Sequence, residues 1–210
     1  RTFSSAASDV YKRQGVDGIM IVTPYYSKPS QHGILRHFEE ISKITDLPIM
    51  AYNIPGRTST LIELETLQTL VDDIGIHSIK DAVGDFEFSK KQLELLKDKA
   101  DIYSGNDNQT YDFVINGGVG VVSVASHVVG DEISEMISFA KDNDLEKAEE
   151  INMQLSNLFE AIFEEPSPGP IKKILSESWE EVGEPLLPIT SITPELANKI
   201  RGFYKKIKEN

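Results

Sequence analysis

Five short apolar runs, spaced about 25 to 28 residues apart and separated by amphipathic helical segments, dominate the sequence from Gly18 onward. Each run is rich in β-branched residues and almost continuously hydrophobic, which is typical of strands buried on both faces of a parallel sheet. The runs occupy residues 19–23, 48–52, 77–80, 101–104 and 119–124. Strands that alternate with helices at this spacing predict a series of βα units.

Polar side chains recur where each predicted strand ends and its loop begins: Tyr25 and Tyr26, Tyr52 to Arg57, Lys80, Gly105 to Asp107, and Ser123. In a closed barrel of parallel strands these ends converge on one face, where such barrels place their active sites. A doubly wound sheet would gather fewer of them around one point. We therefore predict an α/β fold, a TIM (β/α)8 barrel of which about five βα units are present.

The remaining chain predicts two further parts. After residue 144 the pattern becomes helical, and we expect residues 145–210 to form a helical extension packed on a partial barrel of residues 15–144. Three more units would require roughly 80 residues. The segment 1–14 has no strand or helix period and resembles translated adapter sequence, so we expect it to be foreign or disordered and the gene model to be incomplete.

Composition narrows the functional classes. The net charge of -13 argues against nucleic acid or an anionic membrane as partner. The chain has no cysteine, no apolar stretch long enough for a membrane span and no recognisable export signal, so we expect a cytoplasmic protein. The four histidines are scattered without ligand spacing, so we expect no metal and no cofactor.

Lys80 is the strongest candidate for a catalytic residue. It closes the third apolar run, where burial of an amine favours its neutral, nucleophilic form and suits it to attack a carbonyl and form a Schiff base. Taken alone, a lysine at a strand end more often reaches solvent. Its neighbourhood in the repeat pattern is what favours the catalytic interpretation.

Five motifs in order and in register resemble the 4-hydroxy-tetrahydrodipicolinate synthase (dihydrodipicolinate synthase) family of the pyruvate-dependent class I aldolase and N-acetylneuraminate lyase superfamily. The motifs are Tyr-Tyr-Ser-Lys-Pro-Ser-Gln at 25–31, Tyr-Asn-Ile-Pro-Gly-Arg-Thr at 52–58, Ile-Lys-Asp-Ala at 79–82, Ser-Gly-Asn-Asp at 104–107 and Gly-Gly-Val-Gly-Val-Val-Ser at 117–123. The resemblance runs from about Gly15 to the C-terminus. The first motif and Arg57 favour this synthase over the lyases.

The resemblance implies a lyase of lysine and diaminopimelate biosynthesis that condenses pyruvate with aspartate semialdehyde. It implies Lys80 as the Schiff-base lysine, Tyr52 as proton donor and acceptor, and Tyr26 as a relay residue that reaches a neighbouring subunit in a homodimer or homotetramer. Arg57 would bind the semialdehyde carboxylate, and Val122 and Gly105 would line the pyruvate site. Each position also has a plain structural alternative. Tyr52 could be a core tyrosine, Tyr26 an aromatic packing residue and Arg57 a surface arginine. Val122 and Gly105 could serve ordinary strand and turn packing.

Departures from the family pattern leave other readings open. Asp81 and Val83 replace a usual glutamate and threonine or serine, and Asn106 replaces an aspartate. The Thr-Thr motif that holds the pyruvate carboxylate lies outside this sequence, as do most contacts for lysine feedback, of which Tyr25 alone has a matching position. Another pyruvate-dependent aldolase, or a barrel fragment without activity, are the alternative hypotheses.

Overall fold

The computed structural model describes residues 15–209, so the segment 1–14 that was expected to be foreign or disordered lies outside the described residues. The chain divides into two compact units. Of the described residues, the first unit comprises 15–106 together with Asn116–Val122, and the second comprises Asp107–Ile115 together with 123–209.

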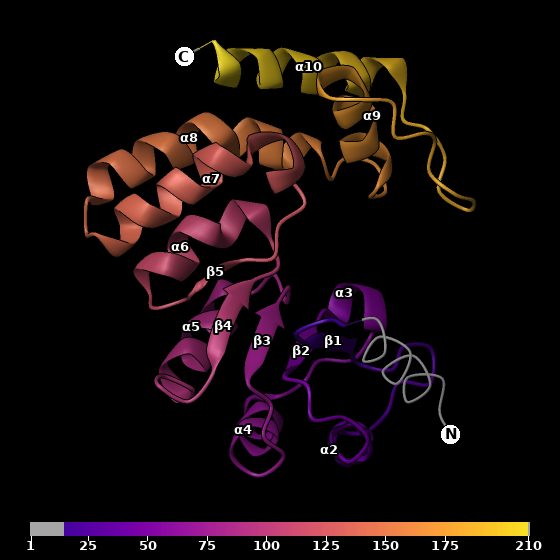
Figure 1. The fold of residues 1–210 in the computed structure, drawn as a ribbon, viewed down its shortest axis with the longest axis vertical. Helices are drawn as coiled ribbons and strands as arrows, with labels where there is room; N and C mark the ends of the chain where they lie inside the picture. The colour runs from indigo at the N-terminus through magenta and orange to yellow at the C-terminus, as the bar shows by residue number, and fades with distance from the viewer. Residues whose placement is uncertain (1–14, 210) are drawn as a thin grey trace. The chain divides into compact units, whose positions relative to one another are not determined.

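A five-stranded parallel sheet forms the centre of the first unit (Figure 1). Its strands lie side by side in chain order: β1 (Ile19–Val22), β2 (Ile49–Asn53), β3 (Ser78–Asp81), β4 (Asp101–Ser104) and β5 (Gly120–Val121). All five predicted strands are confirmed, but β5 is shorter than the expected 119–124. The Val122 N–H still donates to the Ser104 carbonyl, 2.9 Å away, whereas the N–H groups of Val124 and Ala125 donate to the Asp107 side chain instead of a neighbouring strand.

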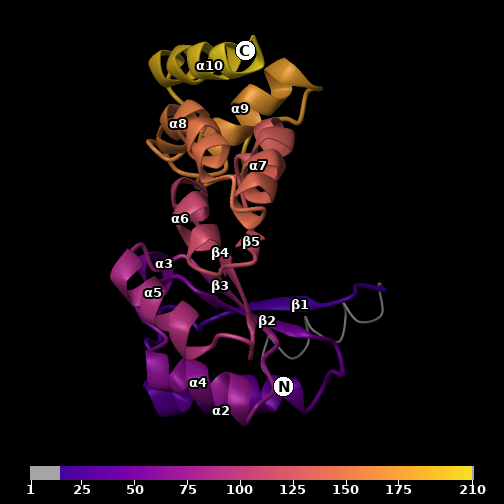
Figure 2. The ribbon, with the colours of Figure 1, turned by 90° about the vertical axis from the view of Figure 1, so that its left-hand side faces the viewer.

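Four helices follow the strands of the first unit: α2 (Gln31–Ser42), the single turn α3 (Pro55–Thr58), α4 (Leu64–Asp72) and α5 (Phe86–Leu95). The Ser30 hydroxyl accepts from the Gly33 N–H and so caps α2 at its predicted start. Ile34, Phe38 and Ile41 form the buried face of α2. Contacts of α2 with α4 and of α4 with α5 place these helices in succession along the sheet (Figures 1 and 2).

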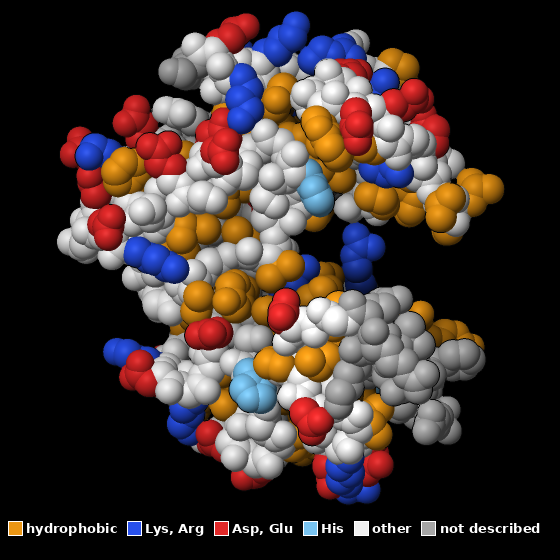
Figure 3. Space-filling model, in the orientation of Figure 1, with side chains coloured by type: hydrophobic (Ala, Val, Ile, Leu, Met, Phe, Trp, Pro, Cys, Tyr) orange, Lys and Arg blue, Asp and Glu red, His pale blue; other side chains and the backbone are white. Residues whose placement is uncertain are grey.

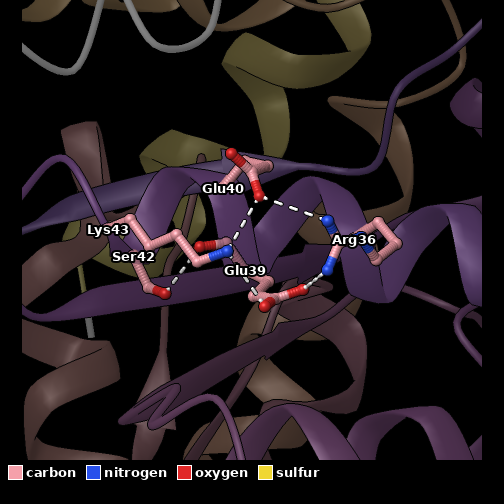
Figure 4. A network of polar contacts seen from close by, with 5 residues as sticks. All are labelled: Arg36, Glu39, Glu40, Ser42 and Lys43. Atoms are coloured by element: carbon pink, nitrogen blue, oxygen red, sulfur yellow. Dashed lines mark hydrogen bonds and ion pairs between the residues drawn. The ribbon is translucent and has the colours of Figure 1, made fainter.

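The outer face of α2 carries a network of ion pairs (Figure 4). Lys43 lies 3.0 Å from a Glu39 carboxylate oxygen and 2.9 Å from one of Glu40, and Arg36 pairs with both carboxylates from the other side. These spacings of three and four residues bring the charges together on a helix surface. All four side chains are substantially exposed, so water and salt screen the pairs and they contribute little to stability.

The second unit is helical: a 3₁₀ turn η1 (Asp107–Gln109), α6 (Thr110–Ile115), α7 (Ser126–Lys141), α8 (Leu145–Ala161), α9 (Gly169–Ser178) and α10 (Pro194–Lys208). Helices α7 and α8 pack together, and α10 contacts both α8 and α9 (Figure 1). One core cluster of this unit comprises Val114, Met136, Ala140 and Ala148. The three predicted helices after residue 144 are therefore present within one or two residues of their expected limits.

Asp107 organises the entry into α7. Its buried carboxylate accepts hydrogen bonds from the Ser123 hydroxyl and from the N–H groups of Val124 and Ala125, the latter two at 3.2 and 3.1 Å. The Ser123 hydroxyl oxygen in turn accepts from the Ser126 N–H at 2.8 Å. A buried carboxylate is tolerated when several donors replace its water, and this one fixes the loop that ends β5.

Acidic and basic side chains are interspersed over both units on the face that Figure 3 shows. On this face the acidic side chains are not gathered in one patch. No helix within residues 15–209 combines the length and apolar character needed to cross a bilayer.

Candidate active site

Tyr52 and Lys80 occupy neighbouring positions at the carboxyl ends of β2 and β3. The register pairs Tyr52 with Lys80 and Lys80 with Tyr103 of β4. Laterally paired residues point to the same face of a sheet, so these three side chains share one face. The next residues along the strands, Asn53 and Asp81, therefore point to the opposite face.

The Lys80 amine lies over the ring of Tyr52, with its Nζ atom 4.2 Å from the ring centroid. A cation this close to the face of a phenol ring is attracted by the ring electrons. The lysine is only 9% exposed. The two groups expected to carry the chemistry, on strands 28 residues apart in sequence, are thus in direct contact.

Tyr52 is half-buried, and that burial raises the pKa of its phenol. The positive charge of Arg57 opposes the rise but is the smaller effect. The phenol therefore keeps its proton at neutral pH and can donate it, as a general acid in this position must. Arg57 itself is exposed, on the single turn α3.

Gly105 makes room for the Lys80 side chain. A Cβ atom at this position would lie 3.0 Å from Cε of Lys80 and 2.7 Å from Cβ of Ala82, closer than side chains normally approach. Its N–H donates to the Asp81 carbonyl, which joins the end of β4 to the end of β3. Glycine is the residue that permits this close approach.

Asp81 anchors the end of β3 on the opposite face from the lysine. Its carboxylate accepts from the Ser89 hydroxyl of α5 at 2.9 Å and from the Val83 N–H at 2.8 Å. Burial raises the pKa of this carboxyl, and these two hydrogen bonds partly oppose the rise. The departure from the expected glutamate is therefore accommodated by a complete set of short contacts.

Three further residues named from the sequence are not part of the contact between Lys80 and Tyr52. Tyr26 is 95% exposed and has a left-handed backbone, with φ of 67°, a conformation that costs energy for a residue with a side chain. Val122 is half-buried and continues the pairing beside β4 through its N–H. Tyr25, the position matched to lysine feedback, is 68% exposed.

The sequence indicates no role for Tyr103, Asn53 or Gln31, although Asn53 and Gln31 lie within two of the five motifs. Strand register alone would have placed Tyr103 beside the lysine, once the pairing of β3 with β4 was known. Asn53 and Gln31 make hydrogen bonds to distant backbone, which no local pattern reveals. Among residues 15–209, no group of three or more histidine, aspartate or glutamate side chains is arranged to hold a metal ion.

The family model for the dihydrodipicolinate synthetase family matches residues 4–207. The chain belongs to this family. A 4-hydroxy-tetrahydrodipicolinate synthase of Listeria monocytogenes is 36% identical over 201 residues, which cover 96% of this chain and 69% of the relative. The enzyme named 4-hydroxy-tetrahydrodipicolinate synthase 1 of Halalkalibacterium halodurans is 42% identical over 181 residues, 86% of this chain and 61% of the relative.

Solved structures of dihydrodipicolinate synthases share the fold. The enzyme from Bacillus anthracis superposes with a TM-score of 0.91 at 36% sequence identity, over 96% of this chain and 69% of that one. The family resemblance predicted from the five motifs is thereby confirmed, and these synthases are TIM barrels.

Proposed function

We propose that this chain carries the synthase chemistry of its family, the condensation of pyruvate with L-aspartate 4-semialdehyde to 4-hydroxy-tetrahydrodipicolinate in lysine and diaminopimelate biosynthesis. The observation that carries the proposal is the contact between Lys80 and Tyr52, with the amine 4.2 Å from the ring centroid. A half-buried phenol that keeps its proton beside a lysine can donate the proton needed for the loss of water in Schiff-base formation.

The proposed reaction begins when the neutral Lys80 amine attacks the C2 carbonyl of pyruvate. Loss of water gives the imine, and loss of a proton from the methyl group gives the enamine. The enamine carbon then bonds to the aldehyde carbon of the second substrate, whose oxygen takes up a proton. Attack of that substrate's own amine on the imine carbon closes the ring and releases Lys80. Tyr52 would supply and receive the protons at the lysine.

The remaining site residues would have the following roles. Arg57 would bind the carboxylate of the semialdehyde with its fork of donors. Gly105 leaves the space in which the lysine and pyruvate meet, and the Val122 backbone would contact pyruvate. Tyr26 would act as a proton relay that reaches the site of a neighbouring subunit, which requires a homodimer or homotetramer; its 95% exposure leaves the side chain accessible for such a contact.

The parallel sheet β1–β5 would be an arc of a (β/α)8 barrel, with the helices after residue 144 packed on it. Parallel order without interruption and strand ends that carry the candidate site support this assignment. The cytoplasmic location expected from the sequence stays a prediction.

Borohydride trapping tests the proposal. Pyruvate should form an imine with Lys80, and sodium borohydride should reduce this imine to a stable adduct. Mass spectrometry should detect the adduct on the peptide that contains Lys80. Lys80→Arg, which keeps the positive charge but cannot form the imine, should give no adduct. Lys90→Arg on the exposed face of α5 is the matched control and should be trapped normally.

Turnover with aspartate semialdehyde then separates the members of the superfamily. Trapping followed by condensation supports the synthase, whereas trapping without condensation indicates another pyruvate-dependent aldolase. A folded chain that forms no adduct would contradict the proposal.

A further inference from the structure

We propose that Asn53 and Gln31 are positioning residues that hold α3 in place and thereby fix the position of Arg57 after the end of β2. The inference rests on the proposed function, because it assigns these two amides to the part of the site that would recognise the aldehyde substrate. Neither residue lies on the face of the sheet that carries Lys80.

Asn53 closes the loop that contains α3. Its fully buried side chain donates from Nδ2 to the Ile62 carbonyl and accepts at Oδ1 from the Ile62 N–H, both at 3.0 Å. This pair of bonds satisfies the donor and the acceptor of one backbone residue, as a neighbouring strand would. Residues 54–61 are therefore tied at both ends to the end of β2.

Gln31 holds the same segment from its other edge. Its Nε2 donates to the Leu61 carbonyl at 2.8 Å, and its Oε1 accepts from the Glu63 N–H at 3.2 Å. In an extended chain, the carbonyl of one residue and the N–H of the second residue after it point to the same edge, while the residue between them points to the other. Gln31 and Asn53 thus form hydrogen bonds with opposite edges of residues 61–63.

The turn between these anchors is too short to be stable by itself. Helix α3 has four residues, and a helix of one turn does not offset the entropy of its own ordering. It has three backbone bonds: the Ile54 carbonyl accepts from the N–H groups of Arg57 and Thr58, both at 3.0 Å, and the Pro55 carbonyl accepts from the Ser59 N–H at 2.8 Å. Anchoring at residue 62 supplies the closure that these bonds need.

The anchored turn determines where the Arg57 charge lies. Asn53 follows Tyr52 directly in β2, with its side chain on the opposite face, so the amide and the phenol are rigidly related. The positive charge of the Arg57 guanidinium lowers the pKa of Tyr52, against the larger, opposite effect of burial. Release of the loop would let Arg57 move while Lys80 and Tyr52 stay in the sheet.

Gln31→Met tests the inference, because methionine has nearly the same shape but makes neither hydrogen bond. His32→Ala, an exposed neighbour in the same helical turn, is the matched control. Hydrogen exchange of the amides of residues 56–60 should become about tenfold faster in Gln31→Met, as expected for the loss of one or two hydrogen bonds. It should not change in His32→Ala.

Kinetics distinguish positioning from a general structural role. In Gln31→Met the KM for aspartate semialdehyde should rise about tenfold, with the KM for pyruvate and kcat within about twofold of the unaltered chain. In an Arg57→Leu background, Gln31→Met should raise the KM no further, because both changes remove the same contact. If the Asn53→Leu variant folds, it should show the same changes as Gln31→Met. If it does not fold, the Gln31→Met variant alone tests the inference.

The outcomes separate this inference from the proposed function. Unchanged exchange of residues 56–60 in Gln31→Met overturns the inference, as does faster exchange with an unchanged KM for the aldehyde. Absence of the pyruvate adduct in the unaltered chain overturns the proposed function instead. In that case the exchange measurement alone decides whether the two amides hold the turn.

Discussion

Gly105 leaves open the space beside the Lys80 side chain, since a Cβ atom on residue 105 would lie 3.0 Å from the lysine Cε. Gly105→Ala should therefore push the lysine from its place over Tyr52. We expect pyruvate trapping to slow by more than tenfold, because small displacements of a reacting group have effects of this size. Overpacking should also lower the free energy of unfolding by about 1–3 kcal/mol. Trapping kinetics and urea unfolding check both effects.

Gly202→Ala is the matched control for that substitution. Gly202 lies inside α10, and a Cβ atom there would meet nothing within 4 Å. Alanine should raise the free energy of unfolding by about 0.5–1 kcal/mol, because glycine is a poor helix former. Equal effects of the two substitutions would contradict the role given to Gly105.

Tyr52→Phe should separate lysine chemistry from proton transfer. Burial raises the pKa of Tyr52, so the hydroxyl is a proton donor across the neutral range, and its removal should lower kcat by roughly 10²–10⁴-fold. The phenyl ring keeps the contact with the Lys80 amine, so slow borohydride trapping of pyruvate should persist. Full kcat in this variant would exclude Tyr52 as the proton donor.

Asp81→Asn should change how stability depends on pH. Burial raises the pKa of Asp81 in the folded chain, so the folded state binds this proton more tightly than the unfolded state does. Between the two pKa values stability falls as pH rises, because the buried carboxyl must ionise. The amide can still accept from Val83 and donate to Ser89, so it keeps both contacts without the charge.

Urea unfolding from pH 4 to pH 8 measures this effect. The Asn variant should gain stability relative to the unaltered chain as pH rises above the ordinary aspartate pKa, and the gain should vanish toward pH 4. A difference that stays constant over this range would show that Asp81 does not titrate differently in the two states.

Gln92→Met should stabilise the chain. The Gln92 side chain on α5 is fully buried, and neither its amide nitrogen nor its amide oxygen has a hydrogen-bond partner among residues 15–209. Methionine fills a similar volume without the unsatisfied polar group, so we expect the free energy of unfolding to rise by about 1 kcal/mol. Thermal and urea unfolding would show it, and a loss of stability would mean that the amide is solvated or bonded.

The parts of the fold with a strong local pattern could be predicted. Each of the five apolar runs forms a strand, and Ser30 marks the start of α2, because burial on both faces and helix capping act over a few residues. The end of β5 could not be predicted. Val124 is apolar enough for a strand, yet its N–H bonds to the distant carboxylate of Asp107.

The candidate site divides in the same way. Regular repeats place Lys80 one strand after Tyr52, which is enough to expect them on one edge of the sheet, but the contact depends on exact register. The need for glycine at 105 depends on side chains from another strand. The hydrogen bonds of Asn53 span 9 residues and those of Gln31 span 30 or more, and the composition of residues 54–63 does not predict them.

The hydrogen bonds of Asn53 and Gln31 to residues 61–63 have a consequence for how this site can evolve. Asn53 and Gln31 hold the ends of the intervening turn. Within it the buried Thr58 hydroxyl lies 3.0 Å from the carbonyl oxygens of Ile54 and Thr60, whereas Gly56, Arg57 and Ser59 are exposed. Under the proposed function, substitutions at these exposed positions would alter which acceptor aldehyde is recognised while the lysine and phenol keep their alignment. Recognition of the second substrate could then change in evolution without a change in the residues that would act on the first.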